Sequence, residues 1–225
     1  MKLNLLTYAD ELFRPMQAKL VEHAQSLMRF DHIYSRNRGN LIETDFYLEN
    51  KYILDKPKGG GYCLWKPYFI LQTLSRMNEG DVLVYMDSAD WINQDFRDEL
   101  LSYMTDKDLI LTAGAFTHKD WTKRDTFVSM HCDTEQYHNA IQLEAGICVF
   151  KNTEYSRKIL NEWLKWCTVS AVITEDENIC NLPNLDGFRE HRYDQSILTN
   201  IAIKNEIQPS DFMRKFTTCN VNMPG

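Results

Sequence analysis

Short apolar runs alternate along the chain with longer segments whose apolar residues recur at helical spacing. The short runs predict strands at residues 3–7, 32–35, 81–86, 108–113 and 146–151, of which those at 3–7 and 81–86 are expected to be buried. The helical spacing predicts helices over residues 15–29, 67–78, 94–104, 153–167 and 193–203. Strands that alternate with helices indicate an α/β fold, with a mainly parallel central sheet and helices on both faces.

The ends of the predicted strands show where a ligand is expected to bind. In open α/β sheets, ligands bind beyond the carboxyl ends of the strands. Thr7 and Tyr8 follow the first strand, and the turn from Asp87 to Asp90 follows the strand at 81–86. We therefore expect these two segments, together with the loop before residue 146, to border the functional site.

The turn after residue 86 holds two carboxylates in the sequence YMDSADW. Asp87 and Asp90 are hard oxygen ligands at the mouth of a buried strand, and such a pair can hold Mg²⁺ or Mn²⁺ against a diphosphate. The same residues could instead cap the helix that follows. The spacing alone leaves both interpretations open.

A lysine stands at the start of the predicted helix in the sequence GGGYCLWKPYF. With the helix N-terminus, Lys66 could form an anion site. It could equally be a solvated surface lysine next to a core tryptophan, Trp65. The three glycines before it make loop 56–61 a candidate lid over a ligand.

Two further segments carry candidate polar residues. In QLEAGICVF, Ala145 and Gly146 at a strand start would let another molecule approach the backbone, with Glu144 at the same edge; the alternative is a bulge with an exposed glutamate. In HRYDQSIL, Asp194 and Gln195 lie in the first turn of a predicted helix, where they could bind sugar hydroxyls or act as an acidic cap.

Composition excludes several classes of protein. The 225 residues carry 25 Lys and Arg against 32 Asp and Glu, a formal net charge of −7, which disfavours nucleic-acid binding and a basic membrane anchor. No apolar run approaches the roughly 20 residues that span a bilayer. The first residues turn acidic by Asp10, unlike a secretion signal, and none of the six cysteines forms a CxxC pair. These features predict a soluble cytoplasmic protein.

The order of these segments resembles that of the GT-A glycosyltransferases: a WKP helix start, a strand ending in DSAD, an AG strand and a DQ helix. The stretch WKPYFILQTLSRMNEGDVLVYMDSAD is especially similar to small GT-A enzymes of large DNA viruses, among them a chlorella-virus domain, and of bacterial polysaccharide clusters. The resemblance covers most of the chain. It implies one Rossmann-like GT-A domain over residues 1–225, to which further domains of a longer protein could be joined.

The resemblance also assigns donor-binding residues. Asp87 and Asp90 match the acidic motif that binds the metal, Mn²⁺ or Mg²⁺, and the ribose-diphosphate, although the spacing here is Asp-x-x-Asp. The UDP-sugar donor is expected to contact Thr7, Tyr8, Lys66, Ser88, Ala89 and Gly146.

Catalytic roles follow from the same resemblance. Asp194 and Gln195 resemble the Asp-Gln pair of retaining GT-A enzymes of the galactosyltransferase and glycogenin group, in which the Asp holds donor hydroxyls and the Gln lies near the anomeric carbon. Glu144 is a candidate nucleophile or base. The C-terminal histidine ligand of that group has no counterpart in the ending TTCNVNMPG, and His191 is the candidate substitute in the donor site.

The expected function is metal-dependent transfer of a hexose or deoxyhexose from a UDP-sugar to a glycan hydroxyl, with retention. One alternative is a nucleotidyltransferase acting on sugar phosphates, although the turn TYADELF lacks the glycine-rich basic signature of such enzymes. A second alternative is a non-catalytic carbohydrate-binding domain.

Overall fold

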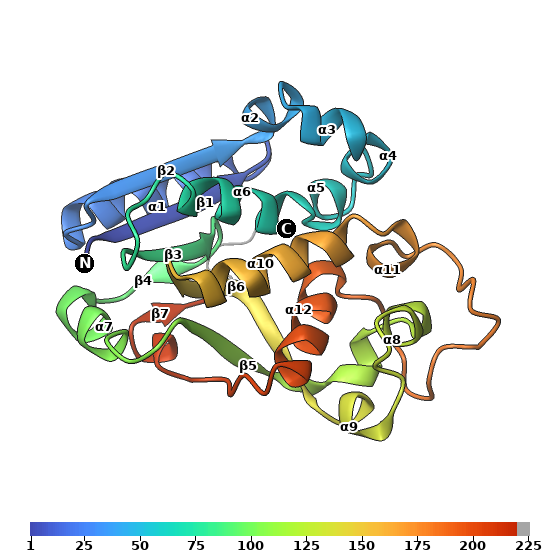
Figure 1. Ribbon diagram of the computed structural model, residues 1–225. Coiled ribbons are helices and arrows are strands. Elements are labelled where there is room, and N and C mark those ends of the chain that lie inside the picture. The colour runs from blue at the N-terminus through green and yellow to red at the C-terminus, as the bar shows by residue number, and fades with distance from the viewer. Residues whose placement is uncertain (220–225) are drawn as a thin grey trace.

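A five-stranded sheet in the order β2-β1-β3-β6-β5 runs through the molecule (Figure 1). The structure is a computed structural model that describes residues 1–219. The strands, in sheet order, are β2 (His32–Asn37), β1 (Leu3–Ala9), β3 (Val82–Asp87), β6 (Ile141–Lys151) and β5 (Leu109–Thr117). β2, β1 and β3 are parallel, and β6 is antiparallel to both of its neighbours. The predicted mainly parallel sheet is therefore confirmed.

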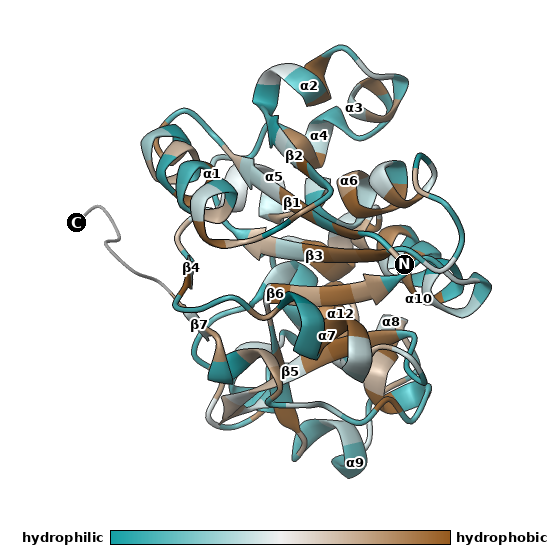
Figure 2. Cartoon of the chain, turned by 90° about the vertical axis from the view of Figure 1, so that its left-hand side faces the viewer, coloured by the Kyte–Doolittle hydropathy of each residue, from teal (hydrophilic) through white to brown (hydrophobic). Residues whose placement is uncertain are grey.

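Helices cover both faces of the sheet because the strands are apolar on both faces. Along β1, Leu3 and Leu5 enter one core, whereas Leu6 and Tyr8 enter the other. Figure 2 shows the apolar strands enclosed between helices. One face is covered by α1 (Arg14–Leu27) and α7 (Arg97–Tyr103). The other is covered by α6 (Trp65–Leu74), α10 (Glu154–Cys167) and α12 (Tyr193–Lys204).

Short elements fill the connections. Four small helices join β2 to α6: α2 (Arg38–Ile42), α3 (Asp45–Glu49), α4 (Lys51–Leu54) and α5 (Gly59–Tyr62). The polar middle section and the segment after α10 form η1 (His118–Trp121), α8 (Arg124–Ser129), α9 (Glu135–His138) and α11 (Ser170–Ile173). Near the end, η2 (Met213–Lys215) precedes a two-stranded ribbon of β4 (Trp91–Ile92) and β7 (Thr217–Thr218). Within residues 1–219, no helix has the length and apolarity needed to cross a membrane.

The strand predicted at 146–151 differs from the structure in its start and its direction. It begins at Ile141, so Gly146 lies in the middle of β6 and not at its beginning. The apolar pattern does not reveal the first half of the strand, because this half contains the polar residues Gln142 and Glu144. Gln142 is nevertheless buried. The antiparallel direction brings this first half, and not the end of the strand, to the carboxyl end of β3.

Candidate active site

The acidic turn forms the centre of the site. Asp87 is the last residue of β3, and its side chain is 40% exposed. Asp90 lies three residues further along the chain and is buried. A Cβ atom at Gly146 would lie 3.1 Å from Asp90 Oδ2 and 3.4 Å from Asp87 Oδ2. Glycine at this position therefore leaves space into which both carboxylates point. The helix-cap interpretation of the turn is wrong, because α7 begins only at Arg97.

Lys66 connects the acidic turn to α12. The lysine is 3% exposed, so the surface interpretation is wrong. Its Nζ lies 3.3 Å from Asp87 Oδ1 and 3.4 Å from Asp194 Oδ2, and it donates a hydrogen bond to the Ala145 carbonyl at 2.9 Å. Three acceptors of the chain thus surround the ammonium group, which holds three separate elements together at the sheet edge.

The protonation of this cluster reflects burial and charge together. Burial alone would lower the pKa of Lys66, but attraction to Asp194 and Asp87 outweighs it and holds that pKa well above its usual value. Burial raises the pKa of Asp194 to about 6, with Lys66 opposing and Asp87 adding to the shift. The Tyr85 hydroxyl, itself buried, donates a hydrogen bond to Asp87 Oδ1. The Asp87 carboxylate therefore has one oxygen bound to the protein and the other directed towards Gly146.

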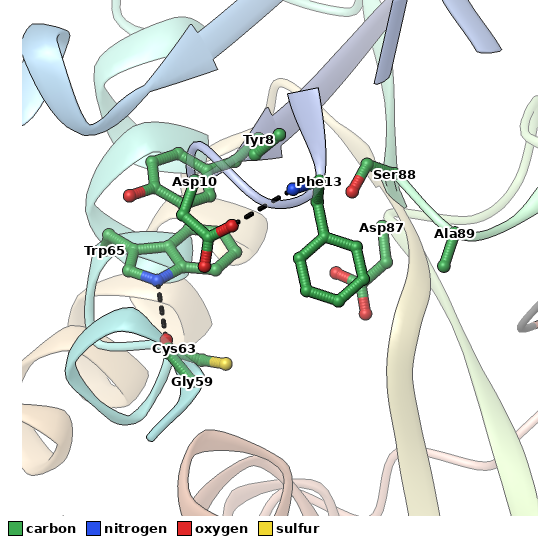
Figure 3. A pocket seen from close by; sticks show the side chains of 10 residues that line it. Tyr8, Asp10, Phe13, Gly59, Cys63, Trp65, Asp87, Ser88 and Ala89 are labelled. Atoms are coloured by element: carbon green, nitrogen blue, oxygen red, sulfur yellow. Dashed lines mark hydrogen bonds between the residues drawn. The ribbon is translucent and has the colours of Figure 1, made fainter. Parts of the chain in front are cut away.

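On one side of Asp87 lies the Tyr8 cavity, with a volume of about 180 Å³. The ring of Tyr8 stacks on Trp65 with centroids 3.8 Å apart and planes 20° from parallel. Figure 3 shows Tyr8, Asp10 and Trp65 on one side of this cavity and Phe13, Ser88 and Asp87 on the other. Ala9, Gly59, Cys63 and Ala89 complete the lining. Thr7 is buried within β1 and is not among the lining residues.

The glycine-rich loop forms part of this cavity wall. Residues 59–63 all have positive φ, between 54° and 98°, so α5 is a single left-handed turn. Gly61 cannot carry a side chain there, because its Cβ would lie 2.6 Å from Leu54 Cα. Lys58 at the start of the turn forms ion pairs with Glu175 and Glu190. The predicted lid segment therefore borders the site, attached by ion pairs to the segment before α12.

On the other side of Asp87 lies the Glu144 cavity, with a volume of about 320 Å³. The Glu144 side chain is 39% exposed and its carboxylate lies 3.1 Å from the Arg214 guanidinium. Gln195 accepts a hydrogen bond from the Ala145 amide at 3.3 Å and donates one to Gln142 Oε1 at 3.1 Å. The lining residues are Asp87, Asp90, Gly114, Phe116, Gln142, Glu144, Gly146, Arg192, Gln195 and Cys219.

Asp87 lines both cavities. The site therefore consists of two chambers that meet at the acidic turn. Such an arrangement can hold two different molecules with their reacting ends at the same carboxylate pair.

His191 lies elsewhere in the structure. Its ring is buried, with Nε2 2.9 Å from the Val172 carbonyl and Nδ1 accepting from the Lys123 amide at 3.3 Å. Burial lowers its pKa to about 3. Both ring nitrogens are bound to the backbone, and the ring lines a cavity with Lys123, so the structure does not bring His191 to the acidic turn. The final residues 220–225, where the sequence offers no histidine, lie outside the described part of the chain.

Several residues of the site escape sequence reasoning. Phe13, Cys63 and Gln142 line the cavities, and Arg214 pairs with Glu144. His118, in the polar middle section, is fully buried, with its ring nitrogens in contact with Asn200 and Thr122. Two of the site residues stood in segments already singled out from the sequence: Gln142 in QLEAG and Cys63 in GGGYCLWKPYF.

The donor set at the acidic turn fits a divalent cation that shares its coordination with a phosphate. Within residues 1–219, no group of three or more His, Cys, Asp or Glu side chains is placed to hold a metal ion. Mg²⁺, however, is commonly held by one or two carboxylates, with phosphate oxygens and water completing the shell. Asp87 Oδ2 and Asp90 Oδ2, both beside Gly146, offer this kind of partial site.

Comparison with known proteins gives structural neighbours only. No family model matches the sequence, and no curated protein matches it. The apo form of mouse xyloside xylosyltransferase 1 aligns with a TM-score of 0.50 at 10% identity, over 93% of this chain and 84% of that one. The apo bifunctional glycosyltransferase WbbM aligns with a TM-score of 0.54 at 11% identity, over 89% of this chain and 37% of that one.

A glycosyltransferase involved in glycosylation of the major capsid of PBCV-1 aligns with a TM-score of 0.37 at 10% identity, over 73% of this chain and 66% of that one. This TM-score is too low to support an inference. At such identities a structural likeness establishes the fold and no more. The chain has the α/β fold of the two better-aligned glycosyltransferases, as its resemblance to GT-A enzymes predicted.

Proposed function

We propose that this protein is a glycosyltransferase that moves a hexose or deoxyhexose from a UDP-sugar to a hydroxyl group of a glycan, with retention. The observation that carries the proposal is the meeting of two cavities at Asp87, beside the space that Gly146 leaves open. A donor on one side and an acceptor on the other would have their reacting atoms at the same carboxylate pair. Mn²⁺ or Mg²⁺ would be held by Asp87 and Asp90.

The Tyr8 cavity suits the nucleotide. The stacked rings of Tyr8 and Trp65 and the ring of Phe13 make its lining aromatic, and Ser88 and Ala89 of the acidic turn also line it. Planar bases bind aromatic walls because stacking removes both surfaces from water. A nucleoside in this cavity would direct its diphosphate towards Asp87.

Charge at the turn explains why a cation would be needed. Lys66 supplies one positive charge to two carboxylates, Asp87 and Asp194, so the cluster retains negative charge. A diphosphate approaching it would be repelled unless a cation intervened. A bound divalent metal supplies the electrostatic stabilisation of the departing diphosphate.

The remaining steps depend on side chains of the chain itself. Asp194, fixed by Lys66, would accept hydrogen bonds from donor-sugar hydroxyls. Gln195 has one N–H left after its bond to Gln142 and would use it beside the anomeric carbon. Glu144, steadied by Arg214, would accept the acceptor's hydroxyl proton or act as the nucleophile.

A thermal-shift experiment tests the proposal. We expect UDP together with Mn²⁺ to raise the melting temperature by about 5 °C or more at roughly 100-fold excess over Kd, and neither alone to do so. Asp87→Asn and Asp90→Asn should abolish the joint shift. Asp106→Asn, an exposed aspartate outside both cavities, is the matched control and should retain it.

Turnover completes the test. A screen of UDP-, GDP- and dTDP-sugars with Mn²⁺ should show hydrolysis of UDP-sugars that EDTA stops. Full hydrolysis in EDTA would contradict the metal, and joint binding without any turnover would favour a non-catalytic domain. NMR of the product's anomeric configuration checks retention, and an inverted linkage would remove Asp194 and Gln195 from the assigned roles.

A further inference from the structure

A bulge between β5 and β6 alters the wall of the Glu144 cavity. The two strands pair at Ala113 with Leu143 and again at Thr117 with Ile141, so residues 114–116 of β5 stand opposite Gln142 alone. Extra residues in one strand leave the ladder and re-aim their side chains, which is why bulges are frequent near active sites.

The bulge requires glycine at its first position. A Cβ on Gly114 would lie 2.7 Å from the carbonyl oxygen of Gln142, a backbone atom that cannot move away without breaking the strand. This close approach carries the chain outward to Phe116, which lines the Glu144 cavity.

Phe116 is an exposed aromatic side chain within a polar cavity. It is 54% exposed, in a cavity lined mainly by carboxylate, amide and guanidinium groups. Its ring packs at 5.1 Å against Trp121, whose other contacts include the Arg192 guanidinium, 4.6 Å from the indole. The phenyl ring is thus supported from behind while its surface remains open to solvent. A ligand that covered the ring would remove apolar surface from water, which is favourable.

We propose that Phe116 is the platform on which a pyranose ring of the acceptor stacks, and that it determines the specificity of the acceptor site. This inference rests on the proposed glycosyl transfer. A pyranose has an apolar face of C–H groups and an edge of hydroxyl groups. The face would lie on Phe116, and the edge would meet Glu144 and the remaining N–H of Gln195.

The chemistry of the cavity favours a saccharide over a peptide. An extended peptide needs a row of backbone partners, whereas the polar groups here are side chains around one ring: Glu144, Gln195 and Arg192. A single aromatic surface with a few polar groups at its edge is typical of a site for a small polar ring.

Saturation-transfer NMR on the protein with UDP and Mn²⁺ tests this role. The probes are the methyl pyranosides of glucose, galactose, xylose and rhamnose. At least one should bind, with saturation concentrated on the C–H protons of one ring face. Phe116→Ala should weaken its binding by about three- to tenfold, the range expected for losing one aromatic contact. Phe116→Tyr should restore it, and Tyr155→Ala, which removes another exposed aromatic ring, should leave it unchanged.

Kinetics separate this role from a structural one. Phe116→Ala should raise KM for a saccharide acceptor by the same factor, with a smaller change in kcat at saturating acceptor. Absence of pyranoside binding, or equal binding by Phe116→Ala, overturns the inference even where UDP and Mn²⁺ bind together. Pyranoside binding that depends on Phe116, with no rise in melting temperature on adding UDP and Mn²⁺ together, would support the saccharide platform and refute the transferase.

Discussion

Two lysines of this chain are buried beside aspartates, yet their surroundings differ. Lys66 is 3% exposed and lies between Asp87 and Asp194, at 3.3 and 3.4 Å. Lys123 is 2% exposed, lies 3.4 Å from Asp125 and donates to the Asp176 carbonyl at 2.7 Å. Burial removes most of the water around both ammonium groups, so other contacts must compensate the cost of this desolvation.

The carboxylates of the two pairs are compensated in opposite ways. Asp125 accepts hydrogen bonds from the backbone amides of Ile179 and Cys180; burial alone would raise its pKa, but these bonds and Lys123 hold it below the usual value. Asp194 has its pKa raised to about 6 by burial and by nearby Asp87. In the Lys123 pair, backbone amides satisfy the carboxylate, so the pair anchors a loop. At Lys66, one ammonium group is shared by two carboxylates beside open cavities, so these carboxylates are available to a ligand.

The largest effect is expected from Lys66→Met. Without the ammonium, Asp87 and Asp194 repel each other and the acidic turn is displaced, so turnover of the UDP-sugar should fall by about 100-fold or more. Steady-state kinetics on the variant, with circular dichroism to verify folding, measures this loss. Wild-type turnover in a folded Lys66→Met variant would show that the Lys66 cluster is merely structural.

Lys123→Met is the matched control for the second pair. Breaking a buried ion pair should lower the free energy of unfolding by about 3 kcal/mol, because the Asp176 carbonyl loses its donor and Asp125 its cation. Urea unfolding gives this value. The turnover number per folded molecule should stay within about twofold of wild type. Loss of turnover at unchanged stability would break the distinction between the two pairs.

The raised pKa of Asp194 predicts a pH dependence. As pH falls the carboxylate takes up a proton, so donor turnover should fall on the acid side. The midpoint should lie at or below about 6, because a cation at Asp87 would oppose the upward shift. At one unit below that midpoint the rate should be about tenfold below its plateau. The same proton favours the folded state: its contribution to stability is complete below the ordinary pKa of 3.8 and is lost as pH rises through about 6.

A pH–rate profile at saturating Mn²⁺ measures the midpoint. Asp194→Asn, which cannot titrate, should lose both most of its activity and this acid limb. An acid limb that persists unchanged in the variant would assign the titration to another group.

Lys58 provides the smallest effect and a third case for the comparison. It also pairs with two carboxylates, Glu175 and Glu190, but its side chain is 45% exposed. Exposed pairs contribute about 0–1 kcal/mol, so Lys58→Met should change the free energy of unfolding by less than about 1 kcal/mol. If Lys58→Met lowered the free energy of unfolding as much as Lys123→Met, burial would not explain the difference between these lysines.

Sequence patterns located the parallel half of the site better than the antiparallel half. The runs that lead to Tyr8 and Asp87 are mostly apolar, so their carboxyl ends were predictable. The first half of β6 was not, because buried Gln142 interrupts the apolar pattern, and its hydrogen-bond partners, Ser196 and Gln195 among them, come from distant parts of the chain. The bulge before Thr117 was equally hidden, since it depends on the register of two strands and not on local composition.

Strand β6 concentrates four attachments within three residues. Glu144 pairs with Arg214, the Ala145 carbonyl holds Lys66, the Ala145 amide holds Gln195, and Gly146 leaves space for the acidic turn. A slip of β6 by one residue against β3 would exchange the two faces of the strand and lose all four together. A molecule with this strand out of register would therefore lack the entire centre of the proposed site, so mispairing of β6 should abolish the proposed activity and not merely alter its selectivity.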